Sequence, residues 1–194
     1  MTLHPQGIKG LWKSGLVLDW HTIDSVCVGE NEFGFPIFET TRSEIGELLY
    51  QFKYHNNQEA LKLLLETACR YLDKAKGKFD VVIPIPPSKP SRTVTAQIAK
   101  GLAKCLNAQY CGDILQKRAS TEELKSVREP ERREELLSKA FSISSSNISD
   151  QVVLLVDDLF RSGATLEAAT KVVKKQGKAA AVYVFAVTRT RVNR

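Results

Sequence analysis

The sequence predicts an α/β protein in which a parallel sheet is flanked by helices. Short apolar runs typical of buried strands alternate with amphipathic helical segments from residue 79 to residue 187. This alternation is typical of parallel strands joined by right-handed crossovers. The 194 residues, 43% of them hydrophobic, are enough for one core and a small appended subdomain.

The first 42 residues differ from the rest and are expected to form a small N-terminal hood, with residues 43–194 as the α/β core. Glycines separate short apolar pieces such as Gly15 to Trp20 and Phe35 to Phe38. This pattern predicts short strands and turns in an antiparallel arrangement. The candidates for stacking on a base are Trp12, Trp20, His21 and Phe33. Such aromatic groups more often fill the core of a subdomain.

Two amphipathic helices are predicted next. The first begins after Ser43, with acidic residues in its first turn, and ends at Asn56. The second ends near Lys76. At the end of the first helix, Lys53, Tyr54 and His55 are interpreted as surface groups rather than catalysts.

A strand and a stiff basic loop follow. The apolar run 79–86 predicts a strand that its prolines terminate, and a helix is expected from Thr93 to about Leu106. Between them, the loop 84–92 combines prolines with hydroxyl groups and cations, including Ser88 and Lys89. A rigid loop of this kind can bind pyrophosphate without a large ordering cost. The alternative for this loop is a solvated proline-rich turn.

The segment 118–139 is expected to be a mobile, solvated arm. It mixes lysines and arginines with six glutamates, and Pro130 interrupts any helix. A short strand is predicted before it, within either 108–111 or 113–115, and an edge strand after it at 140–143.

The most informative stretch runs from Val152 to Thr165. Its first five residues predict a buried strand, which Asp157 and Asp158 close. A loop of small residues follows, and then a helix from Leu166 to Gln176 with Gly177 as its C-cap. A last buried strand is expected at 179–187. Two carboxylates therefore end a strand, and a small-residue loop opens a helix.

This arrangement suits a phosphorylated sugar. Backbone N–H groups and hydroxyls of residues 162–165 can surround a phosphate at the positive end of a helix. Gly163 and Ala164 let the backbone approach the phosphate closely. Asp157 and Asp158 would be repelled by the same phosphate, so they fit ribose hydroxyls or a divalent ion.

Charge and cysteine content limit the remaining choices. Residues 1–80 carry a net charge of −2 and residues 81–194 a net charge of +8. A basic surface suits a small anion or nucleic acid equally well. The four cysteines form no C-x-x-C pair and are expected to be reduced thiols in a cytoplasmic protein. No apolar run is long enough for a membrane span, and the first residues do not resemble a signal peptide.

The stretch from Asp157 to Thr165 resembles the phosphoribosyl-pyrophosphate (PRPP) loop of type I phosphoribosyltransferases. The order of segments from about Gly46 to Arg189 resembles the ComF-like, competence-associated branch of these proteins. The matching pieces are Leu48 to Tyr54, Ile83 to Pro86, Leu115 to Arg118 followed by Thr121, Arg132 with Ala140-Phe141, and Asp157 to Thr165. Two departures are the lack of the N-terminal four-cysteine zinc module and Arg161, which stands where the loop normally has Thr.

The resemblance implies a type I phosphoribosyltransferase fold and displacement of pyrophosphate from carbon 1 of PRPP by a nitrogen nucleophile. Asp157 and Asp158 would be the catalytic pair and would hold Mg²⁺ indirectly, through ribose hydroxyls or water. The 5′-phosphate would be bound by Arg161, Ser162, Gly163, Ala164 and Thr165. The pyrophosphate would be bound by Ser88, Lys89, Lys117, Arg118, Arg132 and Arg133. The arm 118–139 would close over the substrate.

The sequence leaves the acceptor and the choice between catalysis and binding open. Hypoxanthine-type members carry a base-contacting Asp where this chain has Arg161, so purine salvage of that kind is disfavoured. The alternative to an enzyme is a protein that senses PRPP or a nucleotide, or an accessory of DNA uptake whose basic half binds DNA or a DNA-processing protein. The sequence also leaves a homodimer open.

Overall fold

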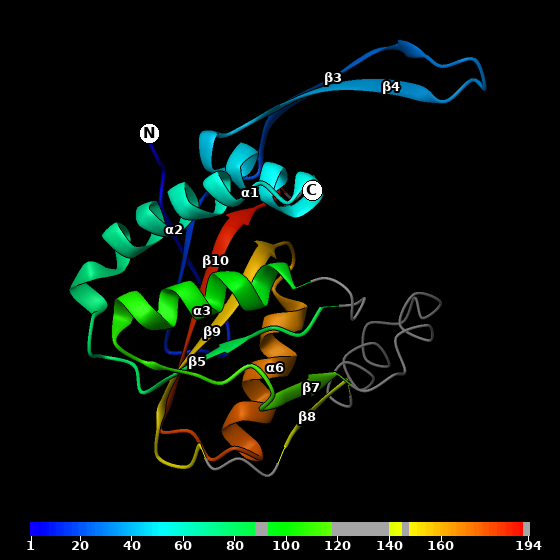
Figure 1. Ribbon diagram of the computed structural model, residues 1–194. Helices are drawn as coiled ribbons and strands as arrows, with labels where there is room; N and C mark the ends of the chain where they lie inside the picture. Colours follow the sequence, from blue (N-terminus) through cyan, green and yellow to red (C-terminus); the bar gives the residue numbers. More distant parts are fainter. Residues whose placement is uncertain (88–92, 118–139, 145–147, 192–194) are drawn as a thin grey trace.

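A six-stranded sheet forms the centre of the computed structural model, which describes residues 1–87, 93–117, 140–144 and 148–191 (Figure 1). Its strand order is β1-β2-β10-β9-β5-β6. The strands are β1 (Gln6–Ile8), β2 (Ser14–Trp20), β5 (Val81–Pro84), β6 (Gln109–Tyr110), β9 (Val152–Phe160) and β10 (Ala181–Arg189). Every neighbouring pair is parallel except β1 and β2. The predicted α/β fold is confirmed.

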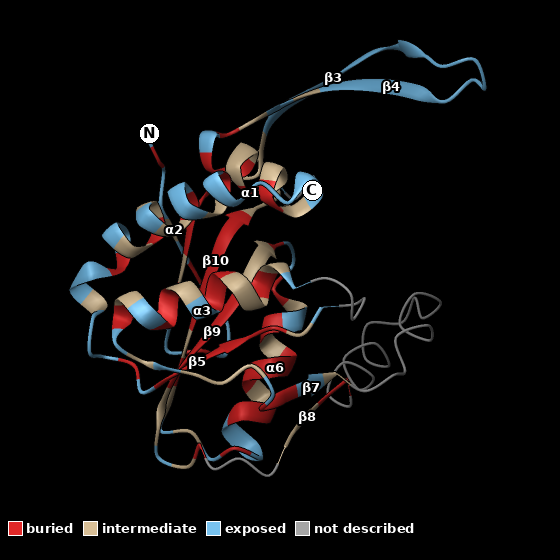
Figure 2. Cartoon of the chain, viewed as in Figure 1, coloured by how far each residue is buried: buried red, intermediate tan, exposed pale blue. Residues whose placement is uncertain are grey.

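Helices cover both faces of this sheet (Figure 1). The helices are α1 (Glu44–His55), α2 (Gln58–Leu72), the short 3₁₀ turn η1 (Asp73–Ala75), α3 (Val94–Leu106) and α6 (Ala164–Lys175). Alternate residues of β9 point to opposite faces. Val153 and Leu155 therefore pack in the core that includes α6, whereas Leu154 and Val156 pack in the core that includes α1, α2 and α3. Figure 2 shows the buried strands between these two layers.

Local capping explains the bounds of α1. The Ser43 side chain accepts a hydrogen bond from the Gly46 N–H, and Asn56 ends the helix in the left-handed conformation. These bounds confirm the prediction. The second predicted helix ends earlier than expected, at Leu72, and η1 continues the turn to Ala75.

The C-cap predicted for α6 is wrong in its detail. The helix ends at Lys175, its cap residue Gln176 is right-handed, and the left-handed residue is Lys178, with φ of 54°. Gly177 is required for a different reason. A Cβ at this position would lie 2.6 Å from both the Ile148 side chain and the Val173 carbonyl oxygen.

Residues 1–42 divide into two parts. Strands β1 and β2 belong to the main sheet, where β2 lies parallel to β10. Strands β3 (Thr22–Glu30) and β4 (Pro36–Arg42) form a separate antiparallel hairpin that projects from the body (Figure 1). The predicted domain boundary at residue 42 stays a prediction.

The segment predicted to be a mobile arm, 118–139, lies outside the described residues. Strands β7 (Leu115–Lys117) and β8 (Phe141–Ile143) flank it and pair antiparallel with each other. The first alternative for the short strand before the arm is confirmed, since β6 lies within 108–111. Of the second, 113–115, only Leu115 lies in a strand, at the start of β7.

The expectation of four reduced thiols is wrong for one pair. Cys69 of α2 and Cys105 of α3 form a disulfide, whereas Cys27 and Cys111 are free. The packing of α2 against α3 brings their Cα atoms to 6.1 Å, within the range for a disulfide. In the described part of the chain, no helix is long and apolar enough to span a membrane.

Candidate functional site

The acidic pair lies near the end of the central strand β9. The sequence predicted that Asp157 and Asp158 terminate this strand, but β9 continues through them to Phe160. It continues because β10 extends alongside, and Thr188 and Arg189 pair with Leu159 and Phe160. The carboxylates therefore sit on a strand with ordered pairing, which fixes their backbone.

The predicted phosphate loop opens α6 directly after this strand. Gly163 is the N-cap residue of α6 and is left-handed, with φ of 84°. A Cβ on Gly163 would lie 3.1 Å from the Phe160 ring, so both conformation and space favour glycine here. The first N–H groups of a helix have no partner within it, so the N-terminus of α6 offers donors to an anion.

Lys53 of α1 contacts the acidic pair, whereas the sequence predicted that it is a surface group. Its ammonium group forms an ion pair with the Asp158 carboxylate, and the two side chains are only 18% and 15% exposed. It is therefore a site residue and not a surface group. The helix period indicates the inward position of Lys53, because this residue follows the buried Leu49 by four positions and so extends the buried face of α1.

The two carboxylates differ in their electrostatics. Burial, followed by the charge of Asp158, raises the pKa of Asp157 to about 7. The Asp158 N–H donates a 2.9 Å hydrogen bond to Oδ1 of Asp157. Burial lowers the pKa of Lys117, and the charge of Asp157 opposes this change. Lys117 of β7 thus interacts electrostatically with Asp157, and its role in pyrophosphate binding stays a prediction.

His21 adds a group that can exchange protons at neutral pH. Its Nδ1 lies 3.2 Å from the Thr188 hydroxyl oxygen, and that hydroxyl donates to the Asp158 carbonyl at 3.4 Å. The hydroxyl oxygen then accepts from the Nδ1–H group, which leaves the lone pair of the neutral ring on Nε2. Burial, followed by the charges of Arg42 and Lys53, lowers the pKa of His21.

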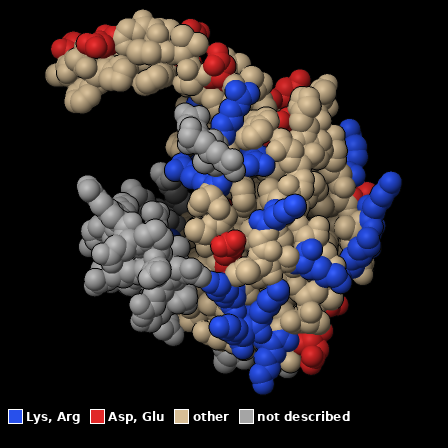
Figure 3. Space-filling model, turned by 180° about the vertical axis from the view of Figure 1, so that it is seen from behind, with Lys and Arg blue, Asp and Glu red and all other residues tan. Residues whose placement is uncertain are grey.

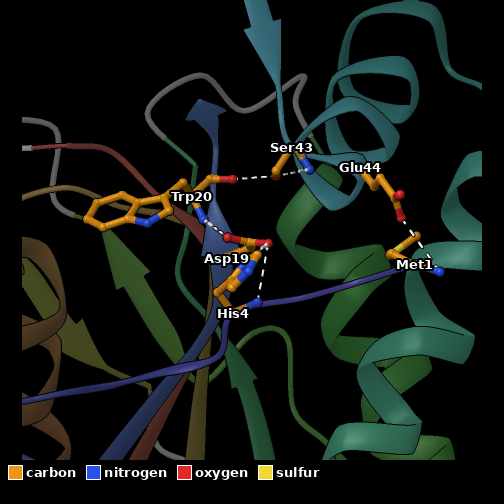
Figure 4. Close-up of polar contacts among 7 residues, drawn as sticks. Met1, His4, Asp19, Trp20, Ser43 and Glu44 are labelled. Atoms are coloured by element: carbon orange, nitrogen blue, oxygen red, sulfur yellow. Dashed lines mark hydrogen bonds and ion pairs between the residues drawn. The ribbon is translucent and has the colours of Figure 1, made fainter. Parts of the chain in front are cut away.

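Polar contacts fix the two residues before His21 and join them to the start of α1 (Figure 4). The Ser43 hydroxyl donates to the Trp20 carbonyl oxygen and accepts from the Gly46 N–H at 3.0 Å. The Asp19 carboxylate accepts from the Trp20 N–H at 2.7 Å and contacts the His4 ring at 3.4 Å. The end of β2 is therefore joined to the start of α1, and α1 carries Lys53.

The other three aromatic residues considered for stacking on a base lie in different environments. Trp12 is 6% exposed and its ring meets Phe160 edge-on, with the centroids 6.5 Å apart, which is the core role that was expected. Phe33 is 74% exposed on the β3–β4 hairpin. Trp20 lies beside Arg189, whose guanidinium carbon is 4.8 Å from the Trp20 ring centroid.

The structure brings only part of the predicted site together. Asp157 and Asp158 lie on β9, Lys117 lies on β7, where the charge of Asp157 opposes the lowering of its pKa by burial, and residues 161–165 follow β9 at the start of α6. The remaining predicted pyrophosphate contacts lie outside the described residues: Ser88, Lys89, Arg118, Arg132 and Arg133. Among the described residues, no three His, Cys, Asp or Glu side chains are grouped to hold a metal ion.

Comparison with known proteins identifies the family of this site. Residues 51–191 match the phosphoribosyl transferase domain family. The chain belongs to this family. The match includes the acidic pair, the loop at the start of α6 and Lys53, whereas His21 lies before it.

Individual phosphoribosyltransferase-domain proteins resemble the chain more weakly. The competence protein ComFC of Bacillus subtilis (strain 168) is 26% identical over 189 residues, which are 96% of this chain and 75% of that protein. This similarity confirms the resemblance to the ComF-like branch.

Two solved structures also resemble the chain. One is adenine phosphoribosyltransferase from Thermoanaerobacter pseudethanolicus, with 14% identity, a TM-score of 0.48, and coverage of 86% of this chain and 95% of that one. The other is a hypoxanthine phosphoribosyltransferase from Staphylococcus aureus, with 14% identity, a TM-score of 0.45, and coverage of 71% and 70%.

Proposed function

We propose that the protein binds PRPP together with Mg²⁺ and transfers the phosphoribosyl group to a nitrogen acceptor, releasing pyrophosphate. One observation carries this proposal. In a chain of the phosphoribosyl transferase domain family, two carboxylates near the end of β9 are followed at once by left-handed Gly163 and the N-terminus of α6. The first feature suits ribose hydroxyls and the second suits the 5′-phosphate.

Each group at the site has a role in this reaction. Asp157 and Asp158 fix the ribose hydroxyls and stabilise the positive charge that develops on the ring as pyrophosphate departs. The loop from Arg161 to Thr165 anchors the 5′-phosphate, so that binding energy remote from carbon 1 positions the reacting carbon. Lys117 stabilises charge on the leaving pyrophosphate. The role expected of Ser88, Lys89, Arg118, Arg132 and Arg133 is the same.

His21 is a candidate for the proton acceptor. A nitrogen nucleophile loses a proton when it bonds to carbon 1, and a neutral imidazole can take it up. The lowered pKa of His21 keeps its ring neutral near pH 7, with the lone pair on Nε2. Thr188 holds the ring through its hydroxyl, and the same hydroxyl binds the backbone of Asp158.

Magnesium fits this site as an ion bound through the substrate. The ordinary route for a protein-held Mg²⁺ is direct carboxylate coordination. Here the Asp158 carboxylate is already paired with Lys53, and Asp157 has a raised pKa. Asp157 and Asp158 would therefore hold the ion through ribose hydroxyls or water. When bound, Mg²⁺ neutralises charge on the pyrophosphate.

Calorimetric titration of Mg²⁺ and PRPP tests the binding step. We expect the wild type to bind and the Asp157→Asn/Asp158→Asn variant to bind at least about 100-fold more weakly, since both ribose-directed carboxylates are lost. The control is Asp73→Asn/Asp113→Asn, which removes two negative charges from exposed positions. Absence of heat with folded wild-type protein would refute the proposal.

The second candidate function is binding of PRPP or a nucleotide without catalysis, in a DNA-uptake or DNA-processing role. The name of the relative ComFC, a competence protein, favours it. Pyrophosphate release, measured across a panel of nitrogen acceptors, separates the two functions. Release that requires Asp157 and Asp158 supports transfer, whereas PRPP binding without release from any acceptor supports the second function.

A further inference from the structure

Beyond its base, where Arg42 pairs with Glu47 of α1, the β3–β4 hairpin has no strand partner within the described residues. Its two strands pair only with each other and leave the body beside the start of α1 (Figure 1). Figure 2 shows that nearly all of the hairpin beyond its base is exposed. Two-stranded hairpins are at best marginally stable in water without a third strand or a packed face. A surface that covers this hairpin would therefore stabilise it.

The hairpin carries most of the exposed apolar surface among the described residues. It holds seven of the twelve large hydrophobic side chains that are exposed, with exposed fractions from 46% to 74%. They are Ile23, Val26, Val28, Phe33, Phe35, Ile37 and Phe38. Together they expose the equivalent of about four whole side chains, or roughly 600–800 Å² at about 150–200 Å² each. A stable interface buries about 800 Å² on each partner.

Charge restricts what can cover the hairpin. The hairpin, residues 22–42, contains four acidic residues and one basic residue, Arg42 at its base, so it carries −3 while the rest of the chain carries +9. Figure 3 shows acidic atoms on the hairpin and Lys and Arg over the body. Nucleic acid and anionic membranes are repelled by such a hairpin. A second copy of the chain supplies a body of opposite charge.

We propose that the hairpin of one copy docks on the body of a second copy, so that two copies exchange hairpins in a closed dimer. The surface assigned to receive it is the turn between β1 and β2. Leu11 is 43% exposed there, between the exposed Lys9 and Lys13, and Lys174 of α6 donates to the Leu11 carbonyl oxygen at 2.5 Å. Mutual exchange closes the assembly at two copies. This inference does not rest on the proposed function.

Molar mass in solution tests the dimer. Light scattering behind gel filtration should give twice the 21.6 kDa of one chain for the wild type. In Phe33→Ser/Phe35→Ser/Phe38→Ser, the dissociation constant should rise roughly 100-fold or more. The control is Leu63→Ser/Tyr71→Ser on α2, where both side chains are similarly exposed. A monomeric wild type at about 100 μM would overturn the proposal, as would equal effects of the two variants.

Two further measurements locate the contact. Cys27 is an exposed free thiol on β3, and Cys111 is a half-buried free thiol on the body that serves as the reference. Alkylation of Cys27 relative to Cys111 should slow at least about tenfold as protein concentration rises through the dissociation constant. An unchanged ratio would contradict docking of the hairpin. Lys9→Glu/Lys13→Glu should also weaken the dimer, and a dimer of unchanged affinity would overturn the receiving surface.

Discussion

Replacing Asp157 by Asn should stabilise the free protein, and the gain should depend on pH. Burial and the neighbouring Asp158 raise the pKa of the Asp157 carboxyl to about 7 in the folded chain, whereas its ordinary value is 3.8. The folded state therefore binds an extra proton between these two values. Wild-type stability falls as pH rises through this window and levels off above about pH 7. Asn is uncharged and causes no such fall.

The expected size follows from the same pKa. Raising the pKa of Asp157 from 3.8 to about 7 lowers the free energy of unfolding by roughly 4 kcal/mol at high pH, at about 1.36 kcal/mol for each unit of pKa. Partial exposure and coupling to Asp158 reduce this value. Between about pH 5 and pH 8, we therefore expect the advantage of Asp157→Asn to grow by roughly 2 kcal/mol. The Asn Oδ1 can still accept the Asp158 N–H, so the backbone contact is preserved.

Urea unfolding at both pH values, analysed by linear extrapolation, measures this difference. The matched control is Asp113→Asn, at an exposed aspartate outside the acidic pair, for which the two pH values should give the same small effect. An Asp157→Asn variant whose stability difference from the wild type is the same at both pH values would refute the reasoning. It would mean that Asp157 is ionised in the folded protein at pH 5.

Three other changes test separate parts of the structure. Lys53→Met leaves the Asp158 carboxylate without its partner, so urea unfolding at pH 8 should show a free energy of unfolding lower by roughly 3 kcal/mol. Reduction of the Cys69–Cys105 disulfide opens a loop of 36 residues, and the free energy of unfolding should fall by roughly 2–4 kcal/mol. Thermal unfolding that is unaffected by a reductant would contradict this expectation. Gly163→Ala places a Cβ on a left-handed residue beside Phe160. Calorimetry should therefore show roughly tenfold weaker PRPP binding, and the free energy of unfolding should fall by about 1–2 kcal/mol.

Features set by neighbouring residues could be predicted from the sequence. Ser43 and Asn56 cap α1 through contacts within a few residues, and the apolar run of β9 is recognisable because both faces of a central parallel strand are buried. The loop that opens α6 was found for the same reason, since its small residues and the preceding acids are consecutive. Such signals do not depend on where the rest of the chain lies.

Features set by distant pairing could not be predicted in the same way. The Lys53–Asp158 ion pair joins residues 105 positions apart, and its recognition requires the packing of α1 on the sheet. The extension of β9 to Phe160 depends on the length of β10. Cys69 and Cys105 show no metal or redox spacing in the sequence, because their pairing follows from the packing of α2 against α3. In each case the partner is supplied by another element.

Some residues of the candidate site lie within the family match, and others precede it. The match covers residues 51–191 and so includes Lys53, the acidic pair and the loop at the start of α6, which are the groups suited to a ribose and its phosphate. His21 and the β3–β4 hairpin precede it, and Ser43 joins them to α1. The Thr188 hydroxyl of β10 links the His21 ring to the backbone of Asp158. Because the groups within the match are the ones proposed to bind the sugar phosphate, differences in acceptor and in assembly are expected to arise from the first 50 residues.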